Sequence, residues 1–207
     1  MYRPAHFAAD EQDQLHAFIE AHPLGSLVVQ TSAGLIANHL PMLWEPSGTH
    51  GLLHGHIARA NTLWRAVTAA SPVLVLFGGA SAYITPSWYP SKQATGQVVP
   101  TWNYSVVHAH GTIEFFDAPD RLLPLVTRLT NQHESRRADP WAVSDAPSDY
   151  IDTMLRAIVG FEIRVERLEG KFKASQNRDQ ADRQGVVRGL AAAGMTDADC
   201  AELVRDP

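Results

Sequence analysis

Short strand-like runs joined by tight turns dominate much of this chain and restrict its fold. Residues 25–31 and 35–44 are β-prone runs separated only by Ser32, Ala33 and Gly34, which favour a turn. Further runs of this kind occupy residues 50–57, 72–78, 81–85, 104–116 and 160–168. Because short turns join antiparallel strands, whereas parallel strands need long crossovers, the pattern favours an antiparallel barrel over a doubly wound sheet.

Helical patterning occurs between and after these runs. Leu15, Phe18 and Ile19 share one face of a helix predicted over residues 10–21. Further helices are predicted over residues 61–67, 120–134 and 150–158, and two short ones in the tail. The predicted class is therefore α+β, with one domain over residues 1–207, peripheral helices and a helical tail over residues 178–207.

Composition excludes several classes of protein. The 207 residues are 45% hydrophobic, enough for a sizeable core, and no apolar run approaches the ~20 residues of a membrane span. The opening residues lack the apolar segment of a secretory signal, and Cys200 is the only cysteine. We therefore expect a cytoplasmic protein without membrane association. The formal net charge of −5 disfavours broad electrostatic contact with nucleic acid, so direct DNA binding is not expected.

Residues 55–61, GHIARAN, close a predicted strand and open a predicted helix. Such a turn directs unpaired backbone N–H groups toward one point, and Arg59 adds a planar donor fork that suits phosphate. The glycine-rich patterns of dinucleotide-binding folds and of P-loops are absent, so neither nucleotide site is indicated. The block indicates an anion site, and the alternative is an ordinary helix start with a surface arginine.

Aromatic and short polar side chains gather on both sides of a long loop at residues 86–100. The flanking sequences are YITPSWY at residues 83–89 and VPTWNY at residues 99–104. This mixture suits a planar, partly polar ligand, because rings can stack on it while amide and hydroxyl groups orient it. The alternative is that Trp88 and Trp102 anchor the core or a dimer interface.

Two of the few lysines lie in the octapeptide GKFKASQN at residues 170–177. On a strand, Lys171 and Lys173 would share a face, with Gln176 near its end, and this arrangement indicates anion contacts. The alternative is a solvated edge strand that its lysines protect from unwanted pairing.

Two histidine pairs have a spacing that can ligate a metal on one face of a strand: His54 with His56, and His108 with His110. The second pair, with Glu114, matches the core of a cupin metal site, but the rest of that motif is missing, so no metal is expected. In the tail, acidic neighbours should raise the pKa of Cys200, which argues against a nucleophile. The same acidic residues argue against a DNA-reading helix-turn-helix.

Six collinear motifs make the chain resemble a known family. They are HLP at residues 39–41, GHIARAN at 55–61, YITPSWY at 83–89, VPTWNY at 99–104, IVGFE at 158–162 and GKFKASQN at 170–177. They are similar to those of the PaiB family, described as FMN-binding negative transcriptional regulators. The resemblance extends over essentially the whole chain. It implies an FMN-binding split barrel: a small antiparallel Greek-key barrel that forms a homodimer and holds the flavin at the subunit interface.

The same resemblance implies which residues approach the cofactor, with the phosphate near Arg59 and Asn61. The residues it assigns to FMN are Asn38, His39, His56, Ala58, Arg59, Asn61, Ser87, Trp88, Trp102, Asn103, Tyr104, Lys173 and Gln176. It implies no catalytic residue. Two alternatives to a regulator stay open. One is an FMN-dependent oxidoreductase, either a flavin reductase or a pyridoxamine-phosphate-oxidase-like enzyme, and the other is a metal-binding barrel that uses the histidine pairs.

Overall fold

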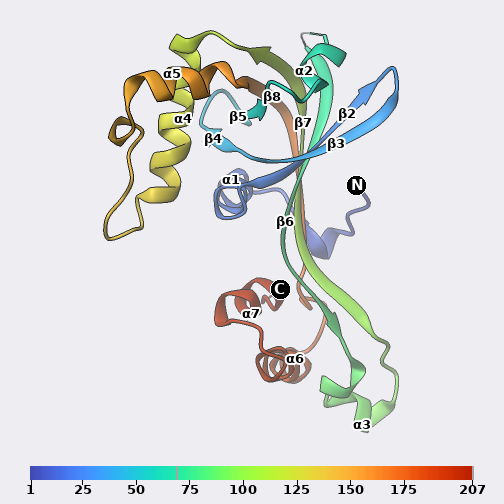
Figure 1. Ribbon diagram of the computed structural model, residues 1–207. Helices are drawn as coiled ribbons and strands as arrows, with labels where there is room; N and C mark the ends of the chain where they lie inside the picture. Colours follow the sequence, from blue (N-terminus) through green and yellow to red (C-terminus); the bar gives the residue numbers. More distant parts are fainter. Residues whose placement is uncertain (69, 207) are drawn as a thin grey trace. The chain divides into compact units, whose positions relative to one another are not determined.

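The computed structural model describes residues 1–68 and 70–206 as an antiparallel sheet with peripheral helices (Figure 1). Its strands are β1 (Ala8–Ala9), β2 (Leu24–Thr31), β3 (Gly34–Pro41), β4 (Leu43–Glu45), β5 (Leu52–Ala58), β6 (Ser71–Ile84), β7 (Thr101–Phe116) and β8 (Ile158–Lys173). Its α-helices are α1 (Gln12–Ala21), α2 (Leu63–Ala66), α3 (Ser91–Thr95), α4 (Pro119–Glu134), α5 (Ser148–Arg156), α6 (Gln180–Ala192) and α7 (Asp197–Leu203). Short 3-10 turns are η1 (Ala5–Phe7), η2 (Pro86–Trp88) and η3 (Val143–Asp145). Within the described residues, no helix is both long and apolar enough to cross a membrane.

Hydrogen bonding joins the strands in the order β3-β2-β6-β7-β8-β5-β4, and β1 pairs with β8. The hairpin of β2 and β3 pairs Leu24 with Pro41 and Thr31 with Gly34, and β2 also pairs antiparallel with β6. Strand β5 pairs antiparallel with β4 on one side and β8 on the other. The predicted α+β class and the antiparallel arrangement are therefore confirmed.

Two predicted elements have different boundaries in the structure. The run over residues 35–44 breaks into β3 and β4, because Pro41 has no N–H for the ladder and Met42 turns into the core. The Met42 N–H donates to the Pro23 carbonyl (2.8 Å) rather than to a strand partner. The helix predicted over residues 61–67 has a single turn, α2, because the backbone at Val67 is already extended.

The runs predicted over residues 72–78 and 81–85 form one continuous strand, β6. Its pairing with β2 covers only the first part of this strand. Further along, the Ala80 N–H donates to a Glu202 carboxylate oxygen (3.0 Å). That approach requires Gly79, because a Cβ there would lie 1.9 Å from the same oxygen. A side-chain acceptor thus replaces a strand partner and keeps the backbone extended.

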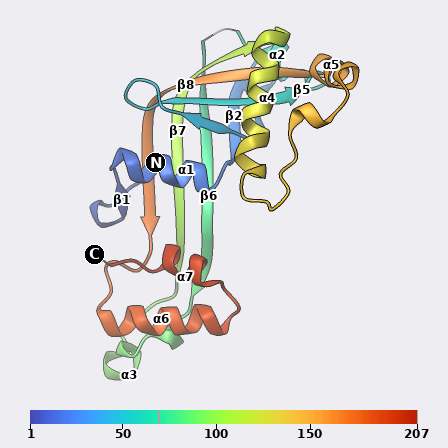
Figure 2. The same ribbon diagram turned by 90° about the vertical axis from the view of Figure 1, so that its left-hand side faces the viewer.

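The described chain comprises two compact units. Unit 1 consists of Met1–Phe18, Gly78–His108 and Glu169–Pro207. The helices of the predicted tail belong to its interior, because Val186, Leu190 and Leu203 pack with Ile84 and Tyr89. Figure 2 shows α6 and α7 side by side, with α3 next to α6. A single domain over residues 1–207 stays a prediction, and the last residue of the predicted tail lies outside the described part.

Unit 2 consists of Ile19–Phe77 and Ala109–Leu168. It contains the β2–β3 hairpin, the β4–β5–β8 ladder and the helices α2, α4 and α5. Helix α4 buries Leu122, Leu125 and Leu129, spaced for one face as the sequence predicts. On β5, Gly55 lies against Phe161, where a Cβ would approach the ring to 2.4 Å. Glycine therefore lets β5 and β8 close tightly beside the turn that follows β5.

Candidate functional site

The turn predicted as an anion site follows β5 and leads into α2. Its backbone donors are used within the fold: the Arg59 N–H donates to the Ala157 carbonyl (2.8 Å), and the Asn61 N–H donates to the Ala58 carbonyl (2.8 Å). The Leu63 N–H donates to the side-chain oxygen of Asn61 (3.1 Å). The expectation of unpaired backbone N–H groups is therefore wrong for these three residues, because the chain turns back on itself before the helix begins.

The Arg59 side chain anchors this turn and still offers donors. Its Nε donates to the Arg156 carbonyl (2.7 Å), and its Nη2 donates to the Ile158 carbonyl (3.1 Å). Its Nη1 donates to an Asp117 carboxylate oxygen (3.0 Å). These contacts use three of the five N–H donors of a guanidinium. The others suit a phosphate oxygen, so Arg59 combines a structural role with the chemistry of an anion site.

Asn38, on β3, meets the turn through its side chain. Asn61 Nδ2 donates to Asn38 Oδ1 (2.7 Å), which fixes the orientation of the Asn38 amide. The Asn38 Nδ2 group is buried and has no hydrogen-bond partner among the described residues. A buried donor without an acceptor is unfavourable, and the carbonyl oxygens and ring nitrogens of a flavin are acceptors of the required kind. This donor, together with Arg59, fits a phosphorylated flavin.

His39 and His56 are placed differently from Asn38. Because side chains alternate along a strand, His39 lies on the opposite face of β3, where its Nδ1 is 2.8 Å from Ser26 Oγ. Asn38 and His39 cannot therefore contact one ligand from the same side of the strand. On β5, His56 and Ala58 share a face. Burial lowers the pKa of His56, which favours its neutral imidazole.

Asn103 and Gln176, both in unit 1, use their amides inside the fold. Asn103 is only 1% exposed, and its Nδ2 donates to Ser175 Oγ (2.8 Å) and to the Leu203 carbonyl (2.9 Å). The Gln176 amide bonds at both ends: its Nε2 donates to the Phe172 carbonyl near the end of β8, and its Oε1 accepts from the Ala174 N–H just after it. Their predicted contact with FMN stays a prediction, but their donors already hold the C-terminal residues of unit 1 in place.

Trp88 packs inside unit 1. Its indole covers Gly189, where a Cβ would lie 2.1 Å from the ring, and its carbonyl oxygen would lie 2.0 Å from a Cβ at Gly185. Two glycines on α6 therefore create the space for this residue, which supports its interpretation as a core anchor. The neighbouring Ser87 is exposed, and its hydroxyl accepts a hydrogen bond from Lys92 Nζ (3.4 Å).

The two lysines near the end of β8 are partly sequestered. Lys171 is 9% exposed, and its Nζ donates to the Tyr2 carbonyl (3.1 Å) and lies 5.3 Å from the centre of the Tyr104 ring. Lys173 Nζ donates to Thr101 Oγ1, and burial lowers its pKa, although Tyr104 opposes that shift. A solvated edge strand protected by lysines is therefore wrong, because β8 lies between β7 and β5 and pairs with β1 at Lys171, so it is not an edge strand.

Trp102 contrasts with its neighbours on β7 because it faces solvent. It is 55% exposed and makes an edge-to-face contact with Tyr83, with ring centroids 6.3 Å apart. Tyr83 is also largely exposed. An exposed aromatic pair suits stacking on a planar ligand or contact with another subunit.

His54 lies in a charged cluster that was not predicted from the sequence. Its Nε2 lies 3.0 Å from a Glu45 carboxylate oxygen and its Nδ1 lies 3.7 Å from Glu162. Burial lowers the pKa of His54, and the two carboxylates oppose that shift. The cluster would have been predictable only from the pairing of β5 with β8, because His54 lies directly opposite Glu162 in that register.

The pKa of the Cys200 thiol is raised, mainly by burial and further by the nearby Asp197 and Asp199, as the sequence predicts for its acidic neighbours.

Comparison with known proteins agrees with this geometry. The family model described as "Putative FMN-binding domain" matches residues 1–167. The "Protease synthase and sporulation protein PAI 2" of Bacillus subtilis is 32% identical over 207 residues, which cover all of this chain and 97% of that protein. An uncharacterized protein of Emericella nidulans is 34% identical over 243 residues, which cover 100% of this chain and 97% of that protein.

Solved structures share the fold at low identity. The flavocytochrome Anf3 from Azotobacter vinelandii has a TM-score of 0.61 at 12% identity and covers 89% of this chain and 78% of its own. The FAD and heme binding protein from Mycobacterium smegmatis has a TM-score of 0.58 at 15% identity, and the match covers 80% of this chain and 72% of that protein. The matched family model, the full-length relative and the fit of the donors together lead to one conclusion. The chain belongs to the FMN-binding domain family, with a split-barrel fold of antiparallel strands and peripheral helices, and its cofactor is FMN.

Proposed function

We propose that FMN binds at the turn after β5, with its phosphate on Arg59 and its ring system against the Asn38 amide. The observation that carries this assignment is the buried Asn38 Nδ2, which has no partner among the described residues. Asn61 acts as a positioning residue, because its own Nδ2 holds the Asn38 oxygen (2.7 Å). When bound, FMN supplies electron-transfer chemistry that no side chain of this turn can provide.

The first test compares FMN with riboflavin, which lacks the phosphate. A charge-assisted hydrogen bond contributes about 1.5–3 kcal/mol, so we expect FMN to bind at least about tenfold more tightly in a fluorescence titration. Arg59→Ala should remove most of that difference. Arg65→Ala is the matched control, because the guanidinium groups of Arg59 and Arg65 lie 5.8 Å and 4.6 Å from the centre of the Trp64 ring, but Arg65 belongs to none of the proposed contacts. Equal dissociation constants for the two flavins would refute this placement of the phosphate.

The biological role that we propose is that of a flavin-bound negative regulator of transcription. Its support is the resemblance to the PaiB family and the full-length similarity to the PAI 2 protein. We propose that regulation is indirect, because the chain carries a formal net charge of −5 and the first turn of α7 bears Asp197 and Asp199. Binding to genomic upstream fragments near 150 mM salt should be weaker than micromolar. A sequence-specific nanomolar dissociation constant would instead support a direct repressor.

An FMN-dependent oxidoreductase is the second candidate. It is favoured by His56, whose pKa is lowered by burial and whose neutral imidazole could donate or accept a proton beside the turn. Anaerobic addition of NADH distinguishes the two roles. Rapid bleaching of the bound flavin, lost in His56→Gln but kept in His50→Gln, would favour the enzyme. Flavin that stays oxidised would favour the regulator.

We propose that the protein is a homodimer. In unit 2, the strand pairing places Val28 beside both Ala37 and Leu74 on one face of the sheet, and none of the three is fully buried. Leu35 is 73% exposed at the end of the same hairpin. An apolar face of this kind is typical of subunit contact. Light scattering should give about twice the chain mass of 22.7 kDa, and the monomer mass at micromolar concentration would contradict the proposal.

A further inference from the structure

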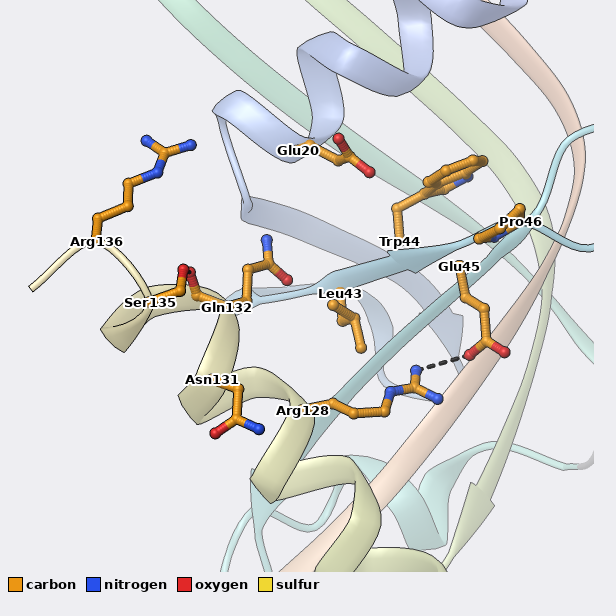
Figure 3. A pocket seen from close by; sticks show the side chains of 10 residues that line it. All are labelled: Glu20, Leu43, Trp44, Glu45, Pro46, Arg128, Asn131, Gln132, Ser135 and Arg136. Atoms are coloured by element: carbon orange, nitrogen blue, oxygen red, sulfur yellow. Dashed lines mark hydrogen bonds and ion pairs between the residues drawn. The ribbon is translucent and has the colours of Figure 1, made fainter. Parts of the chain in front are cut away.

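A hollow of about 610 Å³ opens between β4 and α4 within unit 2. Its strand wall is formed by Leu43, Trp44 and Glu45 of β4 together with Pro46, and its helix wall includes Gln132 (Figure 3). None of its lining residues belongs to the proposed flavin site. The volume is within the ~300–1,000 Å³ typical of pockets for small ligands.

The face of helix α4 that lines this hollow is polar. Its apolar residues Leu122, Leu125 and Leu129 are buried elsewhere in unit 2. The residues of α4 and its C-terminal cap that line the hollow are polar and have the spacing of one helical face: Arg128, Asn131, Gln132 and Ser135. A polar helix face opposite an aromatic strand wall leaves room that neither element fills with its own side chains.

The charges of the hollow are only partly balanced from within. Arg128 Nη2 lies 2.7 Å from a Glu45 oxygen that is also 3.0 Å from His54 Nε2, so this carboxylate is already paired. The Glu20 carboxylate, at the end of α1, makes no hydrogen bond or ion pair with any described residue. Figure 3 shows Glu20 next to Trp44, whereas Arg136 lies on the far side of Glu20 from the indole. Negative charge therefore prevails beside the indole.

Two further features, one on each wall, define what the hollow would accept. The Gln132 Oε1 atom is buried and has no partner among the described residues, so it needs a hydrogen-bond donor. The Trp44 ring is held in place because its Nε1 donates to the His50 carbonyl (3.4 Å). A carboxylate, an unfilled carbonyl acceptor and a fixed indole together have the chemistry that recognises an organic cation.

We propose that this hollow binds a small organic amine, with a protonated nitrogen on an apolar body. The ammonium group donates to Glu20 and to Gln132 Oε1, and the apolar body packs on Trp44 and Leu43. An anionic ligand is disfavoured at this end because Glu20 would repel it. The site is independent of FMN, so its test does not depend on the flavin assignment.

Isothermal titration calorimetry with three phenyl compounds of similar size tests the proposal on the full-length protein. Phenethylamine is the probe, phenethyl alcohol is the neutral control and phenylpropionate is the anionic control. We expect phenethylamine to bind at least about tenfold more tightly than either control, since hydrogen bonds to a charged group are stronger than neutral ones. Glu20→Gln should remove this preference, whereas Glu11→Gln, an exposed glutamate outside the hollow, should retain it.

Variants at the indole test the packing. Trp44→Phe keeps an aromatic face and should retain measurable binding of phenethylamine, whereas Trp44→Leu should weaken it at least about fivefold. Circular dichroism of each variant confirms that it is folded. The proposal is overturned if amine and alcohol bind equally, if neither binds at millimolar concentration, or if folded Glu20→Gln still prefers the amine.

Discussion

Two asparagines, one in each compact unit, were both predicted to approach FMN, and the structure treats them in opposite ways. Asn103 in unit 1 donates both amide hydrogens to Ser175 and Leu203. Asn38 in unit 2 has its oxygen bound by Asn61 and its nitrogen buried without a partner among the described residues. The resemblance to the family assigns both residues to the cofactor and does not distinguish them. What separates a structural amide from a ligand-binding one is whether its donors are already used.

The largest expected effect comes from Asn103→Ala. Its loss leaves a buried hydroxyl and a buried carbonyl without their donor, each of which costs about 1–3 kcal/mol. We therefore expect the free energy of unfolding, measured by urea denaturation, to fall by about 2–5 kcal/mol. If the variant keeps its stability and loses only FMN, then Asn103 is a ligand residue and the contrast with Asn38 disappears.

Gly189→Ala should have the next largest effect on the free energy of unfolding, and the sign of that change distinguishes helix propensity from packing. Helix propensity alone predicts that alanine stabilises an α-helix by about 1 kcal/mol. The new Cβ would lie 2.1 Å from Trp88, however, so packing should reverse the sign and destabilise the protein by about 1–3 kcal/mol. A rise in the urea midpoint would show that Trp88 is mobile and available to a ligand.

Asn38→Ala should affect the cofactor more than the fold. The removed nitrogen has no partner to lose, and the removed oxygen gives up only the hydrogen bond from Asn61 Nδ2 (2.7 Å), so the free energy of unfolding of the apoprotein should fall by no more than about 1 kcal/mol. Its affinity for FMN should fall about tenfold in a fluorescence titration, which corresponds to about 1.4 kcal/mol. Asn131→Ala, on the exposed side of α4, is the matched control and should keep full affinity. Unchanged affinity in Asn38→Ala would place the flavin elsewhere.

The smallest expected effect is a dependence of stability on pH through His56. Burial lowers its pKa from 6.5 in the folded state, so below that value the unfolded chain binds more protons than the folded one. Stability should therefore be complete above about pH 6.5 and fall as the pH decreases toward the folded pKa, with a slope of at most about 1.4 kcal/mol per pH unit from this residue. Urea denaturation at several pH values should give a shallower slope in His56→Gln. An unchanged slope would assign the effect to other groups, among them His54.

Patterns within the sequence located most of the strands and the longer helices. Two β-prone runs separated by the turn residues Ser32, Ala33 and Gly34 identified the β2–β3 hairpin, and the spacing of Leu122, Leu125 and Leu129 identified α4. The continuity of β6 was missed, because the Glu202 side chain that satisfies Ala80 comes from the far end of the chain. Local patterns cannot report a partner that lies more than a hundred residues away.

The sequence by itself determined that this is an antiparallel α+β protein, because periodicity and turn residues act over a few neighbouring positions. Its motifs also identified the family. Only the tertiary structure decided which hydrogen-bonding groups each residue assigned to FMN has left. Arg59 uses three of its five donors on two carbonyls and Asp117, and Asn103 donates both amide hydrogens within the core, whereas Asn38 keeps a donor without a partner among the described residues. Such roles depend on which hydrogen-bonding groups folding leaves unsatisfied, and that balance is set by contacts between segments distant in the chain.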